Sequence, residues 1–163
     1  MDELAQQSVT FGDDTRIRAI LKAVCDMTGM GFAAVSRVTD TRWIACQVLD
    51  KIGFGLEPGE ELDLKTTICD EIREGGKLVV IDHVGADADW RTHHTPMMYG
   101  FESYVSIPIV LEDGSFFGTL CAIDPEPRAL TSGTIVATMQ GMAQQVAAMV
   151  TEKAMGKRAD IEQ

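Results

Sequence analysis

The residues most able to do chemistry are four cysteines and one adjacent histidine pair. Cys121 lies in the apolar segment "FFGTLCAID", residues 116–124, whose alternating residues form two largely apolar faces. A nucleophilic cysteine needs a nearby base or cation that lowers its pKa, and the neighbouring residues offer none. We therefore predict that Cys121 is a core residue of a strand covered on both sides. The alternation places Phe117 on the face of Cys121 and Phe116 on the opposite face.

Metal chemistry is not favoured by the spacing of these residues. The cysteines, at positions 25, 46, 69 and 121, form no CxxC pair and are too far apart for a zinc cluster. His93 and His94 are adjacent, so their side chains diverge on a regular backbone. Further donors nearby are Asp82, His83, Asp87 and Asp89. No spacing such as HxxxH fixes a coordination geometry, so we expect no metal or haem site and interpret the acids of 82–89 as caps of a turn and a short helix.

Aromatic side chains gather in the irregular segment 83–100, which favours a pocket for a small molecule. Such pockets combine apolar walls with a few polar groups that fix orientation, and long loops are commonly functional. The alternative is that these rings only attach the loop to the sheet. The predicted ligand-binding residues are Trp43, Asp82, Trp90, His93, His94, Met97, Tyr99, Phe101, Tyr104 and Ser106. The sequence does not identify the ligand or any cofactor.

Length and charge limit the class of protein. A chain of 163 residues is about the size of one domain and buries roughly two thirds of its unfolded surface. Its net charge of −11 repels phosphate backbones, so we expect no nucleic-acid partner. The sequence shows neither a segment apolar enough to span a bilayer nor a secretion signal. We therefore expect a soluble, cytoplasmic protein with no membrane partner.

Hydrophobic periodicity predicts the elements that must position these residues. Helices are predicted over residues 13–28, from Thr66 or Thr67 to Arg73, and from about 131 to 157. Strands are predicted over residues 32–38, 42–49, 77–82, 103–110 and 116–123. Asp13 or Asp14 caps the first helix and Gly29 ends it, while Asp113-Gly114 predicts the last hairpin. This order fits a mainly antiparallel sheet with helices on one side.

Four segments follow one another in a familiar order: "GFAAVSRV", "TTICDEI", "KLVVIDHVGADADW" and "FESYVSIPIVLEDGSFFGTLCAID". From about Asp13 to Val150 the chain thereby resembles a GAF domain of bacterial signalling proteins, most specifically in the hairpin that ends in "GTLCAID". The resemblance implies an α+β fold with a mainly antiparallel sheet of five or six strands. Terminal helices would pack on one face, and a ligand pocket would lie on the other, under loops and a short helix.

Two branches of that family depend on residues that this sequence lacks. Free methionine sulfoxide reductases carry a cysteine in the loop before the penultimate strand; loop 83–100 has none, and Cys69 lacks a resolving partner. Bilin photoreceptors stack a histidine on the chromophore, and in cyanobacterial relatives a bonding cysteine directly precedes it. Here Thr92 precedes His93. We therefore expect no catalytic residue and no enzyme activity, and a non-covalent bilin is kept as an alternative.

The last predicted helix carries an apolar stripe whose spacing departs from strict heptads. Because the resemblance implies dimers joined through terminal helices, we expect a homodimer through the first and last helices. We divide the chain into an N-terminal extension (1–12), a GAF domain (13–151) and a helix end or linker (152–163). The expected function is a sensory, small-molecule-binding domain that acts on a kinase or cyclic-dinucleotide enzyme domain. A ligand-free dimerisation module is a further alternative.

Overall fold

The computed structural model describes residues 2–64, 67, 68, 72, 76–87, 99–131 and 133–162, with backbone only for 156–162. The described elements are α1 (Glu3–Gly12), α2 (Thr15–Thr28), β1 (Phe32–Val38), β2 (Trp43–Asp50), β3 (Glu61–Leu62), β4 (Val79–Ile81), the 3-10 helix η2 (Val84–Ala86), β5 (Ser103–Val110), β6 (Phe116–Asp124) and α5 (Ile135–Glu162). Most of the predicted short helix 66–73 and of the segment 83–100 lies outside the described residues.

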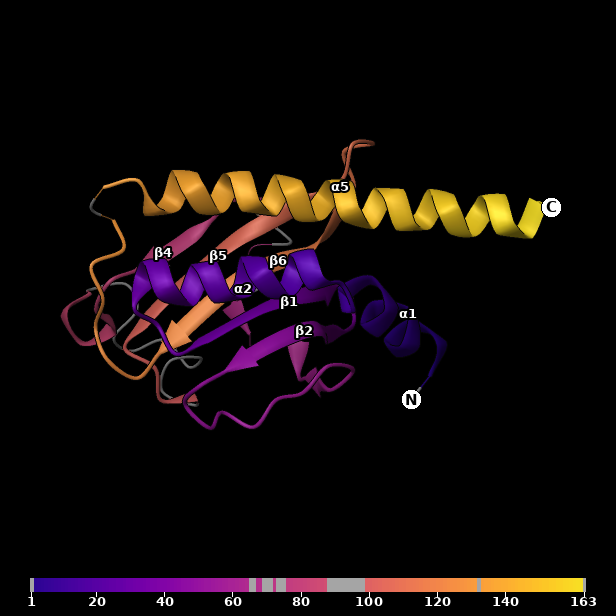
Figure 1. Ribbon diagram of the computed structural model, residues 1–163. Coiled ribbons are helices and arrows are strands. Elements are labelled where there is room, and N and C mark those ends of the chain that lie inside the picture. The colour runs from indigo at the N-terminus through magenta and orange to yellow at the C-terminus, as the bar shows by residue number, and fades with distance from the viewer. Residues whose placement is uncertain are drawn as a thin grey trace.

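Six strands of the described chain form one sheet in the order β3-β2-β1-β6-β5-β4. Each neighbouring pair is antiparallel, so the predicted α+β architecture is confirmed with six strands. Figure 1 shows α2 and α5 side by side across one face of this sheet, with α1 at their end. The opposite face is therefore left for the loops that connect the strands.

The first two helices begin and end at residues suited to those positions. Asp2 caps α1 by accepting a hydrogen bond from the Ala5 amide, and Asp14 caps α2 by accepting one from the Arg16 amide. Gly29 closes α2 in the left-handed conformation, with φ of 76°, as predicted. Residues 1–12 were predicted only as an extension, so α1 is an element that the periodicity did not indicate.

The helix-covered face holds the larger apolar core. On α2 the buried side chains are Ile17, Ile20, Leu21, Val24 and Cys25, and on α5 they are Met139, Ala143, Val146, Ala147 and Val150. They pack against alternate residues of the sheet, including Val35 and Leu120. Full burial of each large aliphatic side chain contributes about 1.5–3 kcal/mol, so these two helices are held firmly on the sheet.

The opposite face carries a second core. Its buried sheet residues are Phe32, Ala34, Val38, Trp43, Ala45, Ile81, Tyr104, Cys121 and Ile123. Leu56, Leu64, Ile68, Ile72 and Phe101 cover them from segments outside the central strands. Cys121 is 5% exposed, so the predicted burial of this thiol is confirmed.

Strand β6 contains an irregularity that reverses one prediction. Ile109 pairs with Gly118 and Val110 pairs with Phe116, so Phe117 is an extra residue in its strand. Such a bulge shifts the alternation by one position. Phe117 therefore lies in the helix-side core with Leu120, and Phe116 packs on the opposite side with Cys121, contrary to the predicted faces.

The last helix begins and ends later than predicted, at Ile135 and Glu162 instead of about 131 and 157. The segment before it is held by Asp82, directly after β4, whose carboxylate accepts hydrogen bonds from the Leu130 and Thr131 amides at 3.0 and 3.1 Å. The Thr131 hydroxyl donates to the same carboxylate at 2.6 Å. The far end of α5 projects past the sheet on the side where the N-terminus lies (Figure 1).

Candidate functional site

A small cavity lies on the loop-covered face of the sheet. Its volume is about 50 Å³, and we call it the inner cavity. Its lining residues are Phe32, Trp43, Phe54, Leu56, Leu62, Thr67, Ile68, Tyr99, Phe101, Tyr104, Cys121 and Ile123. The walls are therefore aromatic and aliphatic, as in most pockets that hold small organic molecules.

A wider groove of about 620 Å³ adjoins the inner cavity, and we call it the outer groove. The two spaces share the lining residues Phe54, Leu56, Leu62, Tyr99, Phe101 and Ile123. Because one set of side chains borders both spaces, a molecule in the outer groove contacts the walls of the inner cavity. Together they form one candidate ligand site with an open part and an inner end.

The aromatic walls form two contacting groups. The Phe54 ring lies 5.0 Å from the Phe32 ring and 5.9 Å from the Tyr99 ring, measured between centroids. On the other side, Phe101 stacks on Tyr104 with centroids 5.2 Å apart and an interplanar angle of 24°. Such contacting rings favour a further flat ring beside them.

Trp43 brings a buried polar group into this wall. It begins β2, where it pairs with Val38 of β1 and Leu62 of β3, and it is 3% exposed. Its indole Nε1–H is buried and has no hydrogen-bond acceptor within the described part of the chain. A buried donor without a partner costs about 1–3 kcal/mol, so this group is unusual in a folded domain.

The loop after β2 is shaped by Asp50. Its carboxylate accepts hydrogen bonds from the amides of Ile52 and Phe54 at 3.1 Å and of Gly55 at 2.8 Å. Burial acts to raise the pKa of Asp50, but the backbone donors outweigh it, so the pKa lies below its ordinary value. This turn places Phe54 against Phe32 and so completes one wall of the site.

The charges at the outer groove are acidic. Glu60 and Glu61 line it, and no lysine, arginine or histidine is among the described residues that line either space. Glu61 forms a bidentate pair with Arg42 at 2.7 Å, and this hydrogen bonding lowers the pKa of Glu61. Arg42 also pairs with Asp2, the cap of α1, at 2.8 Å. The border of the groove is thus connected to the first helix.

A buried polar pair lies farther along the same face of the sheet. The hydroxyls of Ser36 in β1 and Thr119 in β6 are 2.7 Å apart, and both residues are fully buried. Ser106 of β5 is also fully buried and pairs in register with Cys121. None of these three residues lines the inner cavity or the outer groove.

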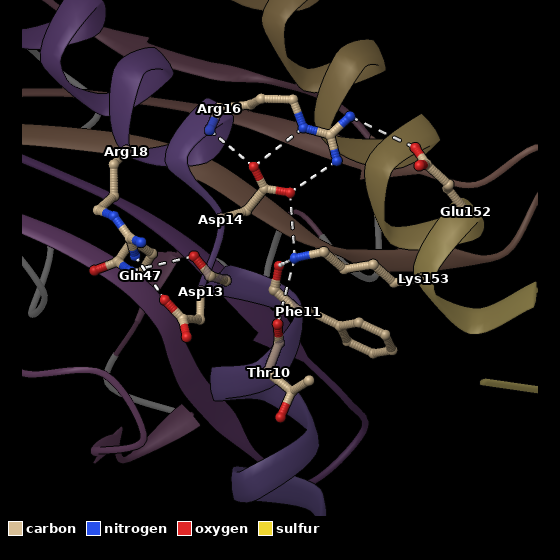
Figure 2. Close-up of polar contacts among 10 residues, drawn as sticks. Thr10, Phe11, Asp13, Asp14, Arg16, Arg18, Gln47, Glu152 and Lys153 are labelled. Carbon is tan, nitrogen blue, oxygen red and sulfur yellow. Dashed lines mark hydrogen bonds and ion pairs between the residues drawn. The ribbon is translucent and has the colours of Figure 1, made fainter. Parts of the chain in front are cut away.

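The three helices meet in a cluster of charges at the junction of α1 and α2 (Figure 2). Lys153 of α5 donates to the Phe11 carbonyl at 3.0 Å and to the Thr10 carbonyl at 3.4 Å, and it lies 3.3 Å from the Asp14 carboxylate. Arg16 binds the same carboxylate at 2.8 Å and reaches Glu152 of α5 at 3.6 Å. We call these residues the helix junction.

Asp14 is the centre of the helix junction. Its side chain is 8% exposed, and the hydrogen bond from Arg16, with further donors from the backbone and Lys153, holds its pKa well below the ordinary range. The lysine meanwhile satisfies carbonyls at the C-terminus of α1, where a positive charge also complements the helix dipole. One cation thus joins α5 to both of the other helices.

The end of α1 packs on β1 and β6 through Arg37. The guanidinium carbon lies 5.8 Å from the centroid of the Phe11 ring and 5.4 Å from that of the Phe117 ring. Its Nη1 donates to the Gln7 side chain at 2.6 Å. Burial lowers the pKa of Arg37, which still stays charged at neutral pH.

Two further features of the described residues concern metal ligands and long apolar helices. No group of three or more His, Cys, Asp or Glu side chains there is arranged to hold a metal ion. No helix in the same part of the chain is long and apolar enough to cross a membrane.

The sequence matches the family model described as GAF domain over residues 14–150. The chain belongs to the GAF domain family. No curated protein matches this GAF domain in sequence.

Solved structures give the same fold at low sequence identity. The GAF domain region of a membrane protein from Geobacter sulfurreducens PCA is 16% identical, with a TM-score of 0.68 and coverage of 92% of this chain and 99% of that one. The blue-light-absorbing PixJ GAF domain of Thermosynechococcus elongatus is 10% identical, with a TM-score of 0.69 and coverage of 98% and 94%. A type II free methionine-R-sulfoxide reductase from Thermoplasma acidophilum is 12% identical, with a TM-score of 0.65 and coverage of 89% and 96%.

The structure brings together four of the ten predicted site residues of this GAF domain: Trp43, Tyr99, Phe101 and Tyr104 line the inner cavity.

The other predicted site residues do not line the cavity or are not described. Asp82 instead holds the segment before α5, and Ser106 lies in the sheet beside Cys121 without lining either space. Trp90, His93, His94 and Met97 lie outside the described residues. The sequence reasoning missed the other eight residues that line the inner cavity: Phe32, Phe54, Leu56, Leu62, Thr67, Ile68, Cys121 and Ile123. One signal in the sequence could have indicated this wall of the site: Phe54 is an aromatic residue in loop 50–63, the second longest irregular segment.

Proposed function

We propose that this GAF domain is a regulatory, non-enzymatic sensor that binds a small organic molecule in the inner cavity and outer groove. The observation that supports it is the pairing of an aromatic pocket on one face of the sheet with three joined helices on the other. A ligand bound on one face can shift the helices from one arrangement to another only if it binds the two arrangements with different affinities. The sensor thus requires a physical connection across the sheet.

Strand β2 supplies that connection. Trp43 lines the inner cavity and Ala45 lies in the core of the same face, whereas Cys46 faces the helices. The Gln47 side chain donates to the Gly12 carbonyl at 3.2 Å, at the end of α1. A ligand that moves β2 at Trp43 therefore moves the surface on which α1 rests.

The helices offer a surface for a second copy of the chain. A groove of about 550 Å³ runs between α2 and α5, and we call it the helix groove; its lining residues are Arg16, Ala19, Ile20, Ala23, Thr138, Gly141, Met142, Gln145 and Met149. Small residues allow close approach of a partner helix, and methionines adapt to it. We infer a homodimer through α2 and α5 that transmits the change to an output domain such as a kinase or cyclic-dinucleotide enzyme.

The test is native mass spectrometry of the purified protein, followed by hydrogen exchange with and without any co-purified molecule. We expect a bound small mass, and ligand-dependent protection in β2, α1 and the end of α5. A bare dimer whose exchange no added small molecule alters would contradict the sensor. That result would support a ligand-free dimerisation module, which the small volume of the inner cavity, about 50 Å³, also favours.

A further inference from the structure

Helix α1 buries little apolar surface. Its buried residues are Ala5, Ser8, Phe11 and Gly12, and of these Phe11 alone has a large apolar side chain. Helix α2, by contrast, buries several large aliphatic side chains. An element with few buried apolar contacts can open while the rest of the domain stays folded. The docking of α1 therefore depends on its polar contacts.

Cations hold α1 at its start, its middle and its end. Arg42 pairs with Asp2 at the start, at 2.8 Å, and Arg37 donates to Gln7 in the middle. Lys153 donates to the last carbonyls of the helix (Figure 2). Arg42 also binds Glu61, which lines the outer groove. It therefore offers the groove a direct contact with the first turn of α1.

One guanidinium joins the two carboxylates. The Nε and Nη2 groups of Arg42 donate to the two oxygens of Glu61 at 2.7 Å, and Nη2 also lies 2.8 Å from an oxygen of Asp2. Asp2 in turn accepts a hydrogen bond from the Ala5 amide at 2.9 Å as the cap of α1. The path from the groove to the helix cap thus passes through a single side chain.

The two ion pairs of Arg42 support each other. Ordering a long arginine side chain costs conformational entropy, and one ordered guanidinium here serves both carboxylates. An isolated exposed ion pair contributes little, whereas a bidentate pair within a network contributes more. When Glu61 no longer holds the guanidinium, the pair with Asp2 alone must offset the whole ordering cost. Loss of the contact at the groove therefore weakens the contact at the start of α1.

We propose that Arg42 is a positioning residue that couples the outer groove to α1, so that an occupant that separates Glu61 from Arg42 loosens the first turns of the helix. This proposal deepens the proposed sensor function, because it names a residue through which the groove reaches the helices. The coupling itself needs no ligand. Arg37 and Lys153 still hold the rest of α1, so the loosening is confined to the start of the helix.

The test is a double-mutant cycle read by hydrogen exchange of the backbone amides of residues 6–12. Glu61→Gln removes the charge at the groove, and Asp2→Asn removes the ion pair with Arg42 but keeps a capping side chain. We expect Glu61→Gln to raise the exchange rates of α1 about two- to fivefold in the wild type, and to change them little in the Asp2→Asn background. Amides of α2 should exchange at wild-type rates in each variant.

Two further variants separate this coupling from a general effect of charge. Glu60→Gln removes a neighbouring acid that also lines the outer groove, and it should leave the exchange of α1 unchanged. Arg42→Lys keeps the charge but loses the planar fork that binds both carboxylates. It should therefore raise the exchange rates of α1 and make them insensitive to Glu61→Gln.

Unchanged exchange of α1 in Glu61→Gln, or equal effects of this change in the two backgrounds, would overturn the proposal. Slower exchange would also overturn it, because Glu61 would then compete with Asp2 for the guanidinium. The same effect from Glu60→Gln would assign the result to charge alone and overturn the coupling. These outcomes leave the sensor function intact. A domain that shows the coupling but binds no small molecule would contradict the sensor function alone.

Discussion

At the scale of single residues, Asp14 uses one carboxylate for two tasks. It caps α2 through the Arg16 amide at 2.8 Å, and it pairs with Lys153 of α5 at 3.3 Å. Asparagine retains the first task and loses the second, whereas alanine loses both. We predict that Asp14→Asn lowers the free energy of unfolding by about 0.5–1 kcal/mol and Asp14→Ala by about 1–3 kcal/mol, as measured by urea unfolding. The control is Asp13→Asn, at a side chain that is 70% exposed. This change should alter the free energy of unfolding little.

The same carboxylate gives a pH dependence of known sign. The pKa of Asp14 is lower in the folded chain than its ordinary value of about 3.9, because Arg16 and Lys153 favour the charged form. Its contribution to stability is therefore complete above that ordinary value and is lost as pH falls toward the folded pKa. We predict that the stability difference between the wild type and Asp14→Asn, measured by urea unfolding, is largest near pH 7 and shrinks below pH 4. A difference that grows on acidification would contradict this assignment.

At the scale of elements, the contact between α1 and β2 depends on the missing side chain of Gly12. A Cβ there would collide with the carbonyl of Cys46, whereas a Cβ at Gly141 of α5 meets open space. We predict that Gly12→Ala destabilises the domain by about 1–3 kcal/mol and increases hydrogen exchange in α1. The matched change Gly141→Ala should stabilise α5 by about 0.5–1 kcal/mol. Equal effects of the two changes would show that α1 does not rest on β2.

The central elements could be predicted from the sequence because their signals are local. The apolar alternation of β1 and β5 and the helical period of α2, with its Asp14 cap and Gly29 end, are readable without tertiary contacts. The bulge at Phe117 could not be predicted, because an extra residue in a strand is recognised only when the partner strand fixes the register. Helix α1 was not predicted, because its packing depends on a contact with Arg37, which is remote in sequence.

The candidate site was predictable only in part for the same reason. Aromatic residue type identified Trp43 and Tyr99, since large rings tend to line pockets. Phe54 reaches the pocket only because the Asp50 carboxylate turns its loop, a set of hydrogen bonds with no sequence periodicity. Asp82 was expected among the ligand-binding groups, but its carboxylate is used by the segment before α5.

At the scale of the whole molecule, the proposed dimer is open to a charge test. Ala19 is exposed on α2 and lines the helix groove, whereas Ala148 is exposed on α5 and does not line it. We predict that Ala19→Glu shifts the protein toward monomer by at least tenfold in dissociation constant, because it buries an unpaired charge in the interface. Ala148→Glu should leave the dimer intact. Sedimentation equilibrium checks both, and dissociation by Ala148→Glu alone would place the interface elsewhere on α5.

The length of α5 has a mechanical consequence. Its 28 residues extend about 42 Å at 1.5 Å each, from the segment that Asp82 holds to the turns that project past the sheet. Because α5 packs on the sheet from Met139 to Val150, any tilt of the whole helix displaces most the turns beyond Val150. A tilt of about 5° about its first residue would displace its last residue by about 4 Å, roughly two thirds of the rise of one helical turn. Lys153 lies about two thirds of the way along α5, so its hydrogen bonds and ion pair in the helix junction resist this tilt.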